Sequence, residues 1–209
     1  LALLAKITNY DASTTKDVYY KLTDDIHLNE PLLDENYELK GTPENMWVPI
    51  ADTQYSGRIA FQGNLDGGGH VITGLYYVTT ASQHYAGLFG VIGETACIHD
   101  LSVIDSYVSG GYSTALLAGS ILNNAVVRRC YANGRVTGSG GYAGILAGSL
   151  DNRGNLIIEH CYTGGLNDSP ANAGGLVGYA GAGTVRNCFA TVYLPVTNNA
   201  ARGGLVGHV

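Results

Sequence analysis

The side chains of this sequence that could do chemistry are its carboxylates, six histidines and four cysteines. Asp24, Asp25 and Asp66 could bind calcium together with backbone carbonyls, because calcium takes oxygen ligands. Paired carboxylates could also serve glycoside hydrolysis. However, Asp66 begins the stretch Asp66-Gly67-Gly68-Gly69, and Asp and Gly are residues that tight turns select. We therefore interpret these carboxylates as structural. We expect no catalytic residue and no cofactor, with calcium as the alternative left open.

Three motifs that would indicate an enzyme are absent from the sequence or incomplete. There is no His-Glu-x-x-His pair, and the six histidines show no metal-ligand spacing. There is also no Gly-x-Ser-x-Gly elbow for a serine nucleophile. Residues 138–143 formally match a dinucleotide-binding fingerprint, but no helix is expected after them. That match is therefore accidental.

The cysteines follow a repeat rather than a disulfide pattern. Cys130, Cys161 and Cys188 recur at equivalent positions, so we expect them to stack in successive coils. Stacked side chains point the same way, and their Cβ atoms then lie farther apart than the roughly 3.5–4.5 Å of a disulfide. We predict a buried, reduced column of thiols, with bridging as the alternative. Cys97 lies outside this column and is predicted to be another core thiol.

Composition and charge exclude several classes of function. Gly accounts for 30 of the 209 residues and only 13% are charged, which predicts many tight turns and few helices. The net charge is −6 with only 11 Lys and Arg, so we expect no nucleic-acid partner. No apolar run reaches the roughly 18 residues of a membrane helix, so we expect no membrane insertion by this chain. The sequence begins at Leu1 and stops in the middle of a repeat, from which we expect it to be part of a longer protein.

A repeat of about 29 residues organises the second part of the chain, and an apolar triplet closed by glycine marks it. The motif occurs as Gly87-Leu88-Phe89-Gly90, Leu116-Leu117-Ala118-Gly119, Ile145-Leu146-Ala147-Gly148, Gly175-Leu176-Val177-Gly178 and Gly204-Leu205-Val206-Gly207. Two further apolar runs recur in each period, so each period should hold roughly three short strands. Strands this short are stable only when they stack on the coils above and below.

The sequence therefore predicts an all-β fold, a right-handed parallel β-helix with coils of about 29 residues. Residues 1–86 are interpreted as an N-terminal cap and leading coils, and residues 87–209 as one continuous solenoid of repeats. Residues 1–7 fit the tail of a short amphipathic helix that would cover the open end of the solenoid. Trp47, the single Trp, should anchor the leading segment.

The glycine-closed motifs at residues 87–90, 175–178 and 204–207 resemble the GLUG repeats of bacterial surface proteins. The leading segment also resembles what precedes such repeats, with Trp47-Val48-Pro49-Ile50 and with Phe61-x-Gly63-x-Leu65-Asp66-Gly67-x-Gly69-His70. Leu116 and Ile145 depart from the motif, because they stand where its first glycine is usual. The resemblance covers almost the whole chain. It implies a surface location and no catalytic activity, since GLUG repeats occur in adhesin-like proteins and in non-catalytic regions of immunoglobulin A peptidases.

Fifteen tyrosines recur through the chain and are the best candidates for contacting a ligand. Aromatic side chains on a solenoid flank could stack on sugar rings or anchor a protein. The alternative is that they cover coil corners or form packing ladders. Tyr112, Tyr131, Tyr142 and Tyr162 are the predicted ligand-facing residues.

The function we predict is that of a non-catalytic, extracellular stalk or adhesion module at a bacterial cell surface, binding a host protein or glycan. One alternative is a polysaccharide-active enzyme, because parallel β-helices also host lyases and hydrolases. The other is an accessory region of an immunoglobulin A peptidase. Acidic residues converging in a groove would favour the enzyme.

Overall fold

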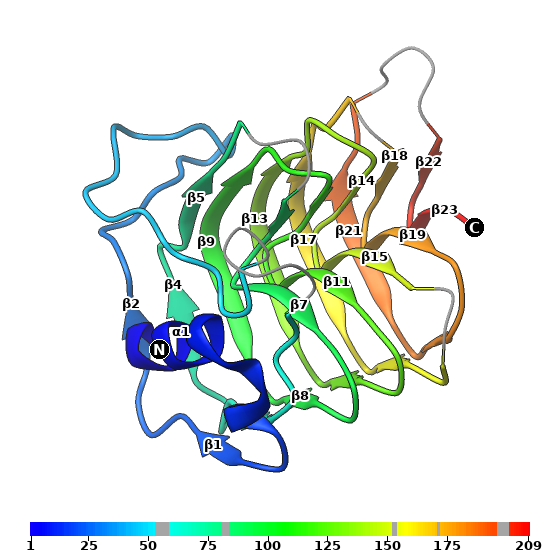
Figure 1. Cartoon of the computed structure of the whole chain (residues 1–209). Helices are drawn as coiled ribbons and strands as arrows, with labels where there is room; N and C mark the ends of the chain where they lie inside the picture. Colours follow the sequence, from blue (N-terminus) through cyan, green and yellow to red (C-terminus); the bar gives the residue numbers. More distant parts are fainter. Residues whose placement is uncertain (53–58, 81–83, 152–153, 171, 196–200) are drawn as a thin grey trace.

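The chain forms an all-β, right-handed parallel β-helix, as a computed structural model of residues 1–52, 59–80, 84–151, 154–170, 172–195 and 201–209 shows (Figure 1). The predicted fold class is confirmed. The coils stack along an axis that runs from the N-terminal end to the C-terminal end of the molecule (Figure 1). Strands of neighbouring coils pair in parallel, so each coil completes the backbone hydrogen bonds of the next.

Four parallel sheets form the walls of the solenoid. Sheet 1 contains β1 (Tyr19–Lys21), β3 (Asn64–Asp66), β8 (Cys97–His99), β12 (Val126–Arg128), β16 (Ile157–Glu159) and β20 (Thr184–Arg186). Sheet 2 contains β2 (Ile26–His27), β4 (Val71–Thr73), β5 (Tyr76–Val78), β9 (Ser102–Ser109), β13 (Tyr131–Thr137), β17 (Tyr162–Asn167) and β21 (Phe189–Tyr193). Sheet 3 contains β6 (Tyr85–Ala86), β10 (Ser113–Thr114), β14 (Tyr142–Gly144), β18 (Asn172–Gly174) and β22 (Arg202–Gly203). Sheet 4 contains β7 (Phe89–Ile92), β11 (Ala118–Ile121), β15 (Ala147–Leu150), β19 (Val177–Ala180) and β23 (Val206–His208).

Each coil passes through sheets 1 to 4 in order, and we number the coils by their strand in sheet 1. Coil 1 begins at β3, coil 2 at β8, coil 3 at β12, coil 4 at β16 and coil 5 at β20. The expectation of three strands per coil is wrong, because there are four. The additional strands belong to sheet 3, where β10 is only Ser113–Thr114 and lies in the stretch before the motif, which contains none of the expected apolar runs. Pairing with β6 and β14 holds it in place, and its own side chains give no strand signal.

A residue in the left-handed conformation makes the corner between sheet 1 and sheet 2. The corner residues have φ near +50°, a region that Asn and Asp visit more readily than most residues. They are Asp100 (54°), Arg129 (50°), His160 (52°) and Asn187 (53°). The same turn therefore recurs in coils 2 to 5 and keeps sheets 1 and 2 in register.

The core is one column of apolar side chains inside the coils. The motif leucines Leu88, Leu117, Leu146 and Leu176 are 0–1% exposed, and one residue per coil from sheet 1 joins them, as with Ile98. Burying a side chain of this size stabilises the fold by about 1.5–3 kcal/mol. Because the core cluster runs from Ala5 to Val177, it joins the leading segment to the repeats.

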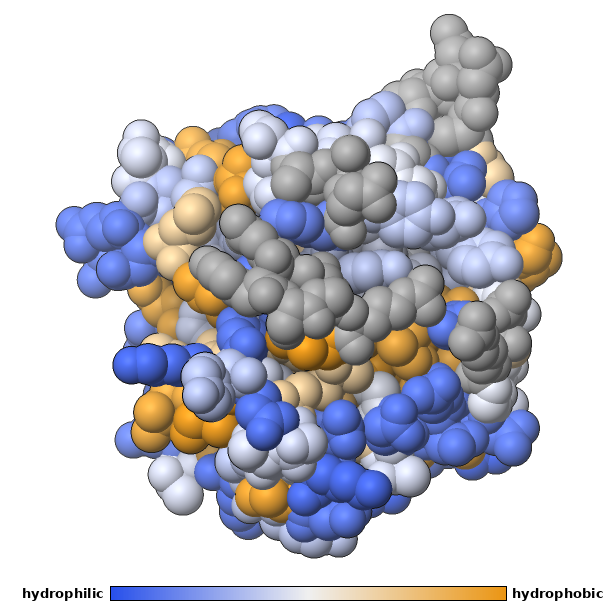
Figure 2. Space-filling view, in the orientation of Figure 1, coloured by the Kyte–Doolittle hydropathy of each residue, from blue (hydrophilic) through white to orange (hydrophobic). Residues whose placement is uncertain are grey.

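The N-terminal helix covers the open end of the solenoid beside coil 1 (Figure 1). It is α1 (Ala2–Tyr10), which ends three residues beyond the predicted tail, and the 3-10 helix η1 (Ala12–Thr15) follows. Ala5 and Thr8 are buried against the core, whereas Leu3 and Ile7 are exposed. Figure 2 accordingly shows hydrophobic surface over α1, at the lower left of the view.

Two predicted features of the leading segment are present in the structure: the Trp47 anchor and the glycine turn that begins at Asp66. The buried Trp47 indole donates a hydrogen bond to the carbonyl of Leu88, 3.0 Å away. The Asp66 side chain accepts from the amide of Gly68 at 2.8 Å, and Gly68 has φ of 63°. This turn connects β3 to β4, so the glycines there supply a backbone conformation that other residues rarely adopt.

Candidate ligand-binding surface

The closing glycines of the motif stack in register along sheet 4 and bring it close to sheet 3. A Cβ on Gly119 would lie 2.7 Å from the amide nitrogen of Ala86, and one on Gly178 would lie 2.5 Å from that of Ala143. Gly148 and Gly207 meet β10 and β18 in the same way, and a Cβ on Gly90 would lie 2.4 Å from the carbonyl oxygen of Ala51 in the leading segment. Each closing glycine of coils 2 to 5 therefore packs on the sheet-3 strand of the preceding coil. Any side chain there would collide with backbone.

The cysteine column lies at the corner between sheets 1 and 2. The amide of Cys130 donates to Sγ of Cys161 at 3.5 Å, and the amide of Cys161 donates to Sγ of Cys188 at 3.4 Å. All four cysteines are free thiols. The hydrogen bond to Cys130 is the main cause that raises the pKa of the Cys161 thiol, to about 12. Thiolates are the reactive form, so the raised pKa keeps the Cys161 thiol unreactive.

The prediction for Cys97 is wrong, because this residue does not belong to the core. It is the first residue of β8, and Ile98 next to it takes the inward position. Side chains alternate between the two faces of a strand, so Cys97 lies on the outer face and is half-buried. Partial burial raises the pKa of its thiol.

Of the three aspartates considered for calcium, Asp66 lies apart from Asp24 and Asp25. The Asp24 carboxylate accepts a hydrogen bond from the amide of Asp25 at 2.9 Å. Asp25 accepts hydrogen bonds from the amide of Val71 at 2.9 Å and contacts Nδ1 of His70 at 3.1 Å. Asp66 pairs instead with Lys21 and lies 3.6 Å from Nδ1 of His99. The described residues therefore group Asp66 with His99 and Asp100, and not with Asp24 or Asp25.

The group of Asp66, His99 and Asp100 brings two carboxylates together on the outer face of sheet 1, at its corner with sheet 2. The Arg129 guanidinium forms two hydrogen bonds of 2.6 Å to the Asp100 carboxylate. These bonds hold the pKa of Asp100 far below its usual range, and the amide of Gly68 lowers the pKa of Asp66. A glycoside hydrolase needs one carboxyl group with a raised pKa to protonate the leaving group. Both carboxyl groups here are held ionised, which suits an ion-pair network.

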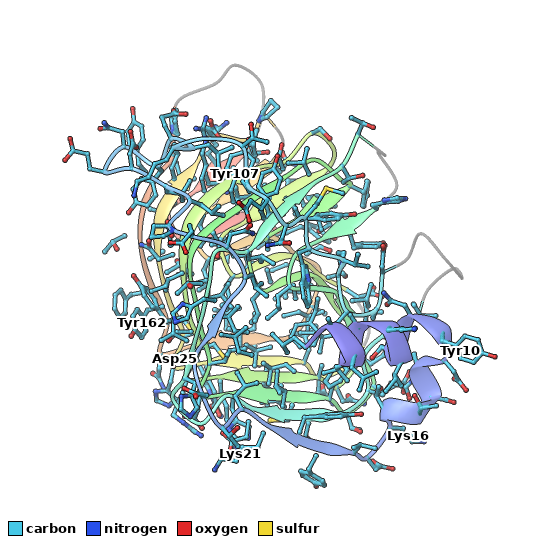
Figure 3. All side chains as sticks on the ribbon, turned by 90° about the vertical axis from the view of Figure 1, so that its left-hand side faces the viewer. Tyr10, Lys16, Lys21, Asp25, Tyr107 and Tyr162 are labelled. Carbon is cyan, nitrogen blue, oxygen red and sulfur yellow. The ribbon has the colours of Figure 1, made fainter. Side chains whose placement is uncertain are left out.

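The first aromatic ladder lies on the outer face of sheet 2 and joins Tyr131, Tyr162 and Phe189. Their ring centroids are 4.4 and 5.3 Å apart, with interplanar angles of 23° and 8°. Tyr162 and Phe189 are 41% and 57% exposed, and Tyr162 projects from the wall in Figure 3. Tyr162 stacks between the other two rings, whereas Phe189, the last ring of this ladder, has its stacking neighbour on one side.

The second aromatic ladder lies along sheets 3 and 4 and has a different geometry. It consists of Tyr85, Tyr112, Tyr142, Tyr179 and His208. Tyr142 and Tyr179 stack at 4.6 Å and 22°, but Tyr112 is perpendicular to both Tyr85 and Tyr142, at 82° and 83°. Burial, together with the neighbouring Tyr112, raises the pKa of the Tyr142 phenol. Tyr112 is 40% exposed and interrupts the stack.

A groove of about 170 Å³ separates the aromatic side chains of sheet 3 from sheet 4. Ser120 and Ser149, nearly buried, lie on its sheet-4 side, and Asp151 lies at the end of β15. The hydroxyl groups form a chain, with Ser113 to Ser149 at 2.9 Å and Ser149 to Ser120 at 3.2 Å. The groove is lined by Tyr85, Val91, Tyr112, Ser120, Leu122, Tyr142, Ser149, Leu150, Asp151 and Tyr179.

The four tyrosines predicted to face a ligand thus fall on two separate surfaces. Tyr131 and Tyr162 belong to the sheet-2 ladder, and Tyr112 and Tyr142 line the groove. Sequence reasoning did not find the groove or its serines. The sequence does contain a signal for these serines, because Ser120 and Ser149 directly follow equivalent closing glycines of the repeat.

Among the described residues, no helix is long and apolar enough to span a membrane.

The comparison with protein families identifies a known motif in coils 4 and 5. The GLUG motif model matches residues 169–192, which include β18, β19, β20 and the closing glycine Gly178. The chain contains a GLUG motif. The predicted resemblance is therefore confirmed, and the glycine contacts described above give the physical reason for the motif's closing glycine.

Two curated proteins share part of their sequence with this GLUG-motif chain. Halomucin of Haloquadratum walsbyi is 30% identical over 152 residues, which is 70% of this chain and 2% of halomucin. A protein of Evansella cellulosilytica, described as a candidate Gly-rich membrane protein, is 35% identical over 78 residues, which is 37% of this chain and 8% of that protein. The chain therefore spans only a small part of these relatives.

A solved structure shares the fold. It is a protein of Bacteroides ovatus described as a candidate immunoglobulin A1 protease, with a TM-score of 0.60. The superposition covers 96% of this chain and 68% of that one, at 20% sequence identity. At this identity the likeness shows a common β-helical architecture.

Proposed function

We propose that this chain is a non-catalytic β-helical adhesion module of a cell-surface or secreted bacterial protein, and that it binds a host glycan or protein on its outer wall. The observation that supports this most directly is the pair of aromatic ladders, which place exposed rings, those of Tyr112, Tyr162 and Phe189, on the outer walls of the coils. Parallel pairing of the coils fixes the spacing of these rings, so a ligand would meet a preorganised surface. Aromatic residues are also enriched at binding hot spots.

The relatives support a surface or secreted location. One is a very long protein named halomucin, and the other is described as a membrane protein. In both, the matching region is a small part of the whole, as expected for a module within a larger surface protein.

The described carboxylates favour a binding module over a polysaccharide-active enzyme. Asp66 and Asp100 do converge, but ion pairs and hydrogen bonds lower the pKa of both. Neither could act as a general acid near neutral pH. The Bacteroides ovatus structure favours a second candidate, an accessory region of an immunoglobulin A peptidase.

The experiment that tests the proposal exposes the 209-residue chain to an array of host glycans and host proteins, with the urea-unfolded chain as control. We expect the folded chain to bind a subset of spots. The bound glycans are then incubated with the chain and assayed for new reducing ends, and immunoglobulin A1 is assayed for cleavage. Binding without product supports the adhesion module. Release of reducing ends would replace it with the enzyme, and an array without any bound spot would refute it.

A further inference from the structure

We infer that the outer face of sheet 1 binds the carboxylate or sulfate group of an acidic glycan, and that the guanidinium of Arg128 holds this group. This inference rests on the proposed function, and it names the ligand class and the residue that would recognise it. It concerns a different wall from the two aromatic ladders, which lie on sheet 2 and along sheets 3 and 4.

The Arg128 guanidinium is accessible at one end. Arg128 is the last residue of β12, and Val127 beside it takes the inward position, so Arg128 lies on the outer face. Its Nε is buried and has no hydrogen-bond partner among the described residues. The two Nη atoms also form no hydrogen bond or ion pair with a described residue, and they are not buried. A ligand can therefore reach the guanidinium at its Nη end, where parallel N–H donors fit a carboxylate or a sulfate.

Arg128 is also the cation of this face that lacks an ion-pair partner in the described part of the chain. Each described carboxylate on the outer face of strands β3 to β20, or at their corner with sheet 2, has a cation of its own. These ion pairs are Lys21 with Asp66 at 3.4 Å, Arg129 with Asp100 at 2.6 Å and Arg186 with Glu159 at 2.6 Å. Lys21, labelled in Figure 3, marks the N-terminal end of this face.

The neighbours of Arg128 leave its charge uncompensated. Its register partners are His99 in coil 2 and Glu159 in coil 4. The hydrogen bonds from Arg186 are the main cause that lowers the pKa of Glu159, and the charge of Arg128 is a smaller one. The whole chain has a net charge of −6, but exposed charges farther apart than about 8 Å are largely screened at physiological ionic strength. A ligand group at Arg128 therefore responds mainly to this guanidinium and to ion pairs that are already neutral.

The alternation of charges on this face favours a glycan over an acidic protein segment. A segment rich in Asp and Glu brings several carboxylates close together, and those that do not reach Arg128 would meet Asp66, Asp100 or Glu159 and be repelled. An acidic glycan separates its charged groups by hydroxyls. These hydroxyls can donate hydrogen bonds to the same three carboxylates, so the ion pairs become contacts for the glycan.

The test measures the affinity of four probes for the folded 209-residue chain by calorimetry. They are unsulfated chondroitin tetrasaccharide, which carries carboxylates, chondroitin sulfate tetrasaccharide, which adds sulfates, neutral chitotetraose, and tetraglutamate as the acidic peptide. We expect both chondroitin probes to bind about tenfold more tightly than chitotetraose and tetraglutamate, with an affinity that falls as salt is added.

Three variants assign the binding to Arg128. Arg128→Gln should weaken binding of the chondroitin probes about tenfold and leave chitotetraose unaffected. Lys6→Gln is the matched control, because it removes the same charge from an exposed position on α1, and it should stay within about twofold. Glu159→Gln frees Arg186 for the same ligand and should strengthen binding about threefold.

Far-UV circular dichroism first verifies that all variants are folded. Equal losses for Arg128→Gln and Lys6→Gln, or no loss for Arg128→Gln, would overturn the inference. So would chondroitin probes that bind no more tightly than chitotetraose or tetraglutamate. Binding to neutral glycans or host proteins alone would overturn it while leaving the adhesion proposal intact. The absence of every bound glycan and protein would overturn both.

Discussion

Substitution of Gly178 by Ala tests whether the closing glycine of the motif is required for the contact between sheets 3 and 4. The new Cβ would lie 2.5 Å from the amide nitrogen of Ala143, 2.6 Å from the carbonyl oxygen of Gly148 and 2.8 Å from the carbonyl carbon of Ala143. All three atoms are backbone, so relief requires a shift of two strands. Overpacking of this kind costs about 3 kcal/mol. Loss of glycine freedom in the unfolded chain offsets about 0.4–1 kcal/mol of this.

The net expectation is a loss of about 2 kcal/mol, or a fall in Tm of about 4–8 °C for a chain of this size. Gly204→Ala is the matched control, since it lies in the motif of coil 5 and nothing lies within 4 Å of its added Cβ. It should leave the free energy of unfolding unchanged or raise it by up to about 1 kcal/mol. Urea unfolding would be followed by circular dichroism for the whole solenoid and by fluorescence of the buried Trp47 for the leading coils. Equal midpoints for the two variants would refute the steric account of the motif.

Three further predictions concern charge, thiols and the core. The Asp100 carboxyl, whose pKa Arg129 lowers, contributes stability above about pH 4 that is lost as the pH falls further. Asp100→Asn should therefore flatten the dependence of Tm on pH between about pH 4 and pH 2, and an unchanged slope would contradict this. In the native chain at pH 8, a thiol reagent such as Ellman's should react slowly and first at the half-buried Cys97, because the hydrogen bond with Cys161 raises the pKa of the Cys188 thiol. The denatured, unreduced chain should titrate four thiols, and a count below four would indicate a disulfide. Leu146→Ala, at a fully buried site in coil 3, should cost about 2–5 kcal/mol in urea unfolding, and a loss below about 1 kcal/mol would show that the core repacks around it.

Much of the fold can be predicted from the sequence because one repeat recurs in the turns, the buried residues and the stacking of the coils. The closing glycines, the inward leucines and the cysteines of the column each recur once per coil, and stacked coils are the arrangement that gives them equivalent surroundings. Sheet 3 was not predicted, and the reason is physical. Its strand in coil 2, Ser113–Thr114, is too short and too polar to show a period, and the neighbouring coils hold it in place.

The candidate site was harder to predict than the fold, because position in a repeat does not say which way a side chain points or what lies beside it. Tyr112 and Tyr131 cannot be told apart as tyrosines of successive repeats. In the structure, Tyr112 lies perpendicular to its aromatic neighbours and lines a groove, whereas Tyr131 stacks in a ladder. The ring of Tyr112 also lies close to Gly141, which belongs to another coil. Cys97 shows the same limit, since only the register of β8 decides that Ile98 takes the inward place.

The closing glycines all contact the coil that precedes their own, so their contacts point in one direction along the solenoid. Gly119 rests on β6, Gly148 on β10, Gly178 on β14 and Gly207 on β18, always one coil toward the N-terminus. The backbone hydrogen bonds between coils run in both directions along the stack, as Leu88 N to Leu116 O and Ala115 N to Ala86 O show. The contacts of the closing glycines therefore have a polarity that these hydrogen bonds lack, and they point toward the end of the solenoid at which α1 lies.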